Sequence, residues 1–122
     1  MFTVQRIYDY RLAAGQTAVF IDRLYPRGVT KEKFATTEWL KDIAPSAELR
    51  RWYHEDPAQH FAAFVTRYHE ELQGETQQKA VAHLLELEKQ HGAVLILTAV
   101  KNPQQSHVSA LAQYLGIPFV YR

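Results

Sequence analysis

Short apolar runs and longer helical periodicities succeed one another along the chain, and together they predict a mixed α/β fold. Residues 2–8, 18–21, 93–98 and 117–121 are rich in β-branched and aromatic side chains, which favours four strands. The run 93–98 shows no polar alternation, which is typical of a strand that is covered on both faces. Pro118 lies near the start of the last run and suits an edge strand.

Helical periodicity dominates the middle and the end of the sequence. We predict helices over about residues 57–73 and 77–91, and a last helix that ends at Gly116. Asp56 is expected to cap the first of these helices and Thr76 the second.

Shorter helical segments are predicted upstream of the long helices. Ser46 is expected to open a helix. Thr30 is expected to cap a short turn, and Thr36 or Thr37 a second turn that contains Trp39.

The order of these elements predicts one α/β domain over residues 1–122. Its simplest form is a four-stranded, mainly parallel sheet in the order 2-1-3-4, with helices on both faces. Residues 9–16 are too few for a standard crossover helix, so the pattern alone leaves a wide hairpin between the first two strands open. Winding reverses between the first and third strands, which places a binding cleft at the loops after Tyr8 and Thr98.

Composition narrows the class of protein. The sequence has no cysteine, which excludes a thiolate nucleophile and a disulfide framework. Its apolar runs are too short to span a membrane, and its first residues lack the features of a signal peptide, so we expect a cytoplasmic protein. The net charge of +1 argues against a surface that is basic throughout, and therefore disfavours nucleic acid as the partner.

The segment Asp22-Arg23-Leu24-Tyr25-Pro26-Arg27-Gly28 directly follows the apolar run 18–21. Ligands of open α/β sheets bind beyond the carboxyl ends of the strands. The planar guanidinium fork matches carboxylate and phosphate oxygens, so Arg23 and Arg27 predict an anion site. A purely structural explanation stays open, in which Asp22 pairs with Arg23 and Arg27 binds carbonyl groups at a helix end.

Further candidates lie after the 93–98 run and at the start of the last helix. Lys101 would help to neutralise the anion, and His107 lies where a helix N-terminus favours negative charge. Asp22, as a base or as an orienting group, and His107, as a proton carrier, are the catalytic candidates. The predicted ligand-binding residues are Arg23, Arg27, Lys101, Tyr25, Ser106 and Arg6.

Other chemistry finds little support in the sequence. The six histidines lack a His-x-x-x-His spacing, and no glycine-rich nucleotide loop occurs, so we expect no metal and no cofactor. The run Arg50-Arg51-Trp52-Tyr53 mixes basic and aromatic residues as single-strand binders do, but its spacing favours packing of Trp52 and Tyr53 in the core.

Several of these motifs resemble one known family. The segments 22–28, 38–42, 44–50 and 54–57 are similar in order and spacing to those of the YeaO-like proteins, also called domain of unknown function 488. The resemblance covers nearly the whole chain and implies a compact α/β domain with parallel strands, which favours a parallel arrangement of the first two strands. It implies no established activity.

The sequence therefore predicts a protein that binds a small phosphorylated or carboxylated ligand at the strand ends, and leaves open whether a reaction follows. Two alternatives use the same surface. One is a nucleic-acid-binding or regulatory module that places the basic loop on phosphates. The other is a protein-interaction domain.

Overall fold

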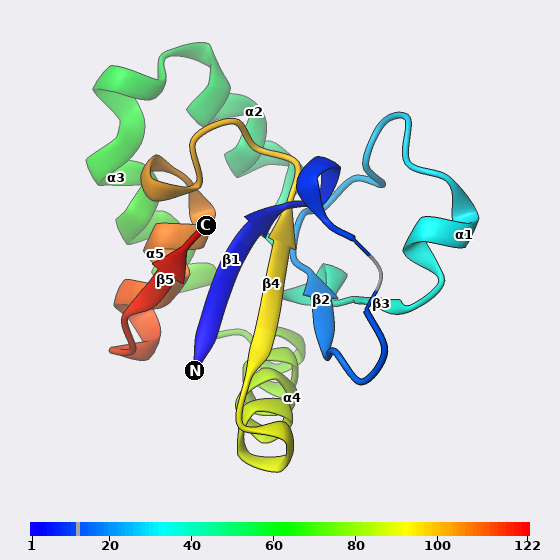
Figure 1. Cartoon of the computed structure of the whole chain (residues 1–122). Helices are drawn as coiled ribbons and strands as arrows, with labels where there is room; N and C mark the ends of the chain where they lie inside the picture. The colour runs from blue at the N-terminus through cyan, green and yellow to red at the C-terminus, as the bar shows by residue number, and fades with distance from the viewer. Residues whose placement is uncertain (12) are drawn as a thin grey trace.

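A sheet of short strands forms the centre of the molecule. The strands are β1 (Phe2–Arg6), β2 (Ala18–Phe20), β3 (Thr37–Trp39), β4 (Val94–Thr98) and β5 (Phe119–Tyr121). The computed structural model describes residues 1–11 and 13–122, within which these five strands form one sheet in the order β3-β2-β4-β1-β5. Every pair of neighbours is parallel, so the carboxyl ends of the strands lie along one edge of the sheet (Figure 1).

The central strand is β4. It pairs with β1 on one side, from Phe2 opposite Val94 onward, and with β2 on the other. All residues of β4 are buried, which confirms the prediction of a strand covered on both faces.

Side chains of the strands alternate between two cores. Val19 and Ile96 point into the larger core, and Phe20 and Leu97 point into the smaller one. The larger core packs against the helices α2 (Ala47–Glu55), α3 (Pro57–Glu71), α4 (Glu75–His91) and α5 (His107–Leu115). Figure 1 shows α2 and α3 near the carboxyl ends of the strands and α4 at the opposite end.

The opposite face of the sheet is covered by shorter segments. The connection between β1 and β2 begins with the 3-10 turn η1 (Ile7–Asp9), and Ile7 and Tyr10 are buried against Phe20 and Leu97. The short helix α1 (Lys31–Phe34) adds Phe34 to this smaller core. Helices therefore lie on both faces as predicted, although the longer ones share a single face.

Local capping signals place most of the helix starts. The side chains of Thr30, Ser46 and Asp56 accept hydrogen bonds from the first turns of α1, α2 and α3, as their sequence positions predict. The start of α4 differs from the prediction, because Gly74 and not Thr76 is its N-cap residue. Gly92 ends α4 in the left-handed region, with φ of 76°, where the lack of a Cβ atom removes the steric penalty.

The predicted fold class is confirmed, but the predicted strand number and order are wrong. The strand at 94–98 lies between those at 2–6 and 18–20. An additional strand, β3, which the sequence did not predict, extends the sheet beside β2. Both of the first two strands run parallel to β4, so the hairpin alternative is excluded. A parallel pair also requires the chain to turn within residues 9–16, and of these position 12 lies outside the described residues.

The additional strand, β3, occupies a segment for which the sequence predicted a helical turn. Residues 37–39 pair with β2, and Trp39 packs on Phe20 with ring centroids 6.3 Å apart. The indole Nε1 of Trp39 donates a hydrogen bond of 2.7 Å to the carbonyl oxygen of Asp22. Tertiary pairing thus overrides the capping potential of Thr36 and Thr37. In the ranges that the structure describes, no helix combines the length and apolarity needed to cross a membrane.

Candidate functional site

A cavity of about 610 Å³ opens at the carboxyl ends of the strands. The loops after β1, β2 and β4, the helix α2 and the start of α5 all contribute to its lining. This is the edge at which ligands of open α/β sheets bind, and the volume lies in the range of small-molecule sites. The predicted cleft location therefore coincides with a cavity of suitable size.

Basic side chains from separate elements line this cavity. They are Arg23, Arg27, Arg50, His54, Lys101 and His107. Arg27 and Lys101 are exposed on the loops after β2 and β4, whereas Arg50 comes from α2. Asp22 is the acidic residue among the described lining residues. The cavity lining thus carries an excess of positive charge.

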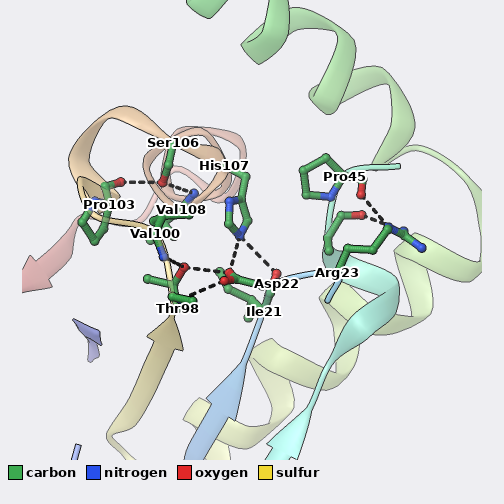
Figure 2. A network of polar contacts seen from close by, with 12 residues as sticks. Ile21, Asp22, Arg23, Pro45, Thr98, Val100, Pro103, Ser106, His107 and Val108 are labelled. Carbon is green, nitrogen blue, oxygen red and sulfur yellow. Dashed lines mark hydrogen bonds and ion pairs between the residues drawn. The ribbon is translucent and has the colours of Figure 1, made fainter. Parts of the chain in front are cut away.

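Asp22 lies at the centre of a hydrogen-bond network that joins β2, β4 and α5 (Figure 2). Its carboxylate accepts a hydrogen bond of 2.7 Å from Oγ1 of Thr98 and one of 2.8 Å from the amide of Ala99. Nε2 of His107 lies 3.0 Å from Oδ1 of Asp22 and 3.1 Å from the carbonyl oxygen of Ile21. Both neighbours are acceptors, so Nε2 carries the hydrogen.

These contacts set the charge state of Asp22. Burial by itself would raise its pKa, but the hydrogen bond and charge of His107 and the hydrogen bonds from Thr98 and Ala99 hold the pKa below the ordinary value of 3.8. Asp22 is therefore a carboxylate at neutral pH, with its oxygens already engaged by the protein.

The start of α5 is held by its own cap. Oγ of Ser106 donates a hydrogen bond of 2.8 Å to the carbonyl oxygen of Pro103 and accepts one of 3.1 Å from the amide of Val108. Oγ of Ser109 accepts a hydrogen bond from the amide of Ser106, which completes a capping box. Ser106, predicted as a ligand-binding residue, lines the cavity and also fixes the position of His107.

The two arginines of the loop after β2 have different surroundings. Nε and Nη2 of Arg23 donate to the carbonyl oxygens of Pro45 and Ala44, at 2.7 and 3.2 Å. Figure 2 shows this guanidinium directed toward Pro45 and away from Asp22. The alternative of an Asp22–Arg23 ion pair is wrong, and the carbonyl-binding role considered for Arg27 belongs to Arg23.

Of two further predicted ligand-binding residues, one lines the cavity and the other stabilises a loop beside it. Tyr25 lines the cavity, and its hydroxyl donates a hydrogen bond of 2.9 Å to the carbonyl oxygen of Val29. Arg6 is absent from the described lining and donates instead to the carbonyl oxygens of Val100 and Ala99, at 3.1 and 3.4 Å. Arg6 therefore supports the loop that carries Lys101.

Arg50 and His54 are lining residues that the sequence prediction missed. The neighbouring Tyr53 packs in the core as predicted, with its ring centroid 4.3 Å from that of Phe64. Arg50 and His54 are four residues apart on α2, a spacing that places both on one face of a helix and was the available signal. Partial burial, the charge of Arg50 and that of His107 lower the pKa of His54 from its ordinary 6.5.

Metal chemistry has no apparent centre in the described part of the chain. Among those residues, no three His, Cys, Asp or Glu side chains gather in a way that could hold a metal ion. The arrangement of the cavity can instead provide several hydrogen-bond donors and positive charges to an anion.

Comparisons with known proteins agree with the family predicted from the motifs. A family model described as "Inactive DUF488-N3 subclade" matches residues 1–119. The uncharacterized protein Rv3073c of Mycobacterium tuberculosis is 38% identical over 115 residues, which cover 93% of this chain and 92% of that protein. The uncharacterized protein YeaO of Escherichia coli is 36% identical over 112 residues, with 91% and 93% covered. No solved structure matches the chain significantly. The chain therefore belongs to the YeaO-like DUF488 family.

Proposed function

We propose that this protein binds a small phosphorylated or carboxylated ligand in the cavity at the strand ends and does not transform it. The observation that carries the proposal is the convergence of Arg23, Arg27, Arg50 and Lys101 on one cavity from three parts of the chain. Charge-assisted hydrogen bonds from such groups are the strongest that a protein offers to an anion. The absence of cysteine from the sequence favours action in the cytoplasm.

The state of Asp22 and His107, the two catalytic candidates, supports the proposal of binding without turnover. The carboxylate of Asp22 accepts hydrogen bonds from Thr98, Ala99 and His107, and its lowered pKa makes it a weak base. Nε2 of His107 donates to Ile21 and Asp22. These groups hold the loops of the site in place, and the description of the subclade as inactive supports the same conclusion.

The test is a titration of inorganic phosphate, glycerol phosphate and succinate, read by thermal shift and calorimetry, on the wild type and two variants. Arg27→Ala removes an exposed guanidinium of the lining. Arg51→Ala removes an exposed guanidinium from α2 that is not among the described lining residues. We expect Arg27→Ala to weaken binding about ten- to a hundredfold and Arg51→Ala to leave it unchanged.

Two results would contradict the proposal. One is an equal response to these anions, or none, in the wild type and Arg27→Ala. The other is binding of duplex DNA or RNA that weakens steeply with salt while small anions have no effect, which would favour a nucleic-acid-binding module.

A further inference from the structure

The cavity that binds the anion also presents uncovered apolar side chains at its rim. Tyr8, Leu24 and Tyr25 line the cavity and are 38%, 56% and 42% exposed. They come from the loops after β1 and β2, beside the basic residues Arg23 and Arg27. A site for a bare inorganic anion needs no such surface, so a second part of the ligand is expected here.

The tyrosine rings at the rim are held by the protein. The Tyr25 hydroxyl donates to the carbonyl oxygen of Val29, and its ring lies 4.9 Å from that of Phe34 between centroids. The guanidinium of Arg6 lies 5.1 Å from the ring centroid of Tyr8. Because these contacts restrict both rings in advance, stacking against them costs little further side-chain entropy.

The charge of the lining indicates the other part of the ligand. Arg27, Arg50 and Lys101 line the cavity, Arg23 adds its charge while it donates to Pro45 and Ala44, and the carboxylate of Asp22 is already compensated by its hydrogen bonds. Such a lining suits a group with two negative charges and several acceptor oxygens, which describes a phosphate monoester better than a single carboxylate.

We infer that the ligand is a nucleoside phosphate, with its phosphate on the basic residues Arg27, Arg50 and Lys101 and its planar base on the exposed rings of Tyr8 and Tyr25. The inference rests on the proposed anion-binding function. Stacking on an aromatic ring tolerates different bases, so we expect a modest preference among them. The cavity of about 610 Å³ is large enough for a ligand of this class.

The experiment compares inorganic phosphate, ribose 5-phosphate, adenosine and the four nucleoside monophosphates by calorimetry. On the wild type, we expect a nucleoside monophosphate to bind about tenfold or more tightly than ribose 5-phosphate, and adenosine to bind weakly. Tyr25→Ala should sharply reduce this advantage, so that the ratio of nucleotide affinity to ribose 5-phosphate affinity falls toward one. Tyr25→Phe, which keeps the ring, should retain most of the advantage. Arg27→Ala should weaken ribose 5-phosphate and the nucleotides by the same factor.

The outcomes separate this inference from the function on which it rests. If phosphate and ribose 5-phosphate bind and depend on Arg27 but the base adds nothing, the nucleotide inference is overturned and the anion-binding function stands. Adenosine that binds as tightly as its monophosphate would also overturn the inference. If no anion binds in an Arg27-dependent way, both fail. Circular dichroism of the Tyr25 variants verifies that they are folded.

Discussion

Nε2 of His107 lies 3.0 Å from Oδ1 of Asp22, and this contact ties the first turn of α5 to the end of β2. The same carboxylate binds Thr98 and Ala99 at the end of β4. Asp22 therefore connects three elements at the edge of the sheet where the cavity opens.

Asp22→Asn should destabilise the fold by about 1–3 kcal/mol, because the donors of Thr98, Ala99 and His107 would lose a charged acceptor. An amide supplies a single acceptor oxygen, and its NH₂ group would face donors that now bind a carboxylate. Urea unfolding of this variant, compared with the exposed Asp42→Asn, measures the effect. A loss no larger than that of the Asp42 control would mean that the network does not stabilise the fold.

The stability of the wild type should also fall in acid. Because folding lowers the pKa of Asp22, its contribution is fully present above the ordinary value of 3.8 and is lost as the pH falls through the lower folded value. The difference in unfolding free energy between the wild type and Asp22→Asn should therefore shrink below about pH 4. Urea denaturation at a series of pH values tests this, and a constant difference down to pH 2 would contradict it.

Arg23 and Arg27 should differ in how much the substitution by alanine lowers the stability of the fold. Arg23→Ala removes two hydrogen bonds to the segment before α2, so we expect a loss of about 1–3 kcal/mol in unfolding free energy. Arg27 is exposed, and Arg27→Ala should change stability by less than about 0.5 kcal/mol. Urea unfolding of both variants measures these two changes in unfolding free energy. Equal destabilisation would show that Arg27 also has a structural role.

The elements of the fold could be predicted because their signals are local. Ser46 and Asp56 mark helix starts by side-chain caps, and the continuous apolar run at 93–98 marks a strand covered on both faces. The order of the strands could not be predicted in the same way. The insertion of β4 between β1 and β2 depends on pairing between residues far apart in sequence, and residues 37–39 are too few to show a period.

The residues of the candidate site also differ in whether a local sequence signal could locate them. The loop of Arg23 and Arg27 could be located because it follows an apolar run, and such runs end at the edge where ligands bind. The presence of Arg50 and His54 depends on how α2 packs beside the strand ends, which no local pattern specifies. The partner of each polar group was also beyond prediction, since Arg23 binds carbonyls of the segment before α2.

Truncation in the smaller core should be as costly as in a core formed by helices. Leu97 is fully buried on the face covered by the connection after β1, near Ile7 and Phe20. Leu97→Ala should lower the unfolding free energy by about 2–5 kcal/mol through lost burial and a residual cavity. The exposed Leu85→Ala on α4 is the matched control and should change it little. Similar small losses in both would show that this face is loosely packed.

Anion binding should be coupled to proton uptake by His54. In the free protein, partial burial and the charges of Arg50 and His107 lower the pKa of His54 below 6.5. A bound anion favours the imidazolium and raises that pKa, so affinity should increase as the pH falls between the bound and free values. Sulfate is the suitable probe, because its own charge stays constant where a phosphate monoester titrates.

Calorimetry of sulfate binding between about pH 5 and 8 measures the coupling, since His54 has an ordinary pKa inside this range. In the wild type, affinity should rise toward acid, with a net uptake of protons that is visible in buffers of different ionisation enthalpy. His54→Gln should flatten this dependence, whereas His91→Gln, an exposed histidine at the end of α4, should not. His107 is present in both variants, so the comparison isolates the effect of the imidazole of His54. An unchanged pH profile in His54→Gln would contradict the coupling, because the imidazole that is expected to take up the proton is absent from this variant.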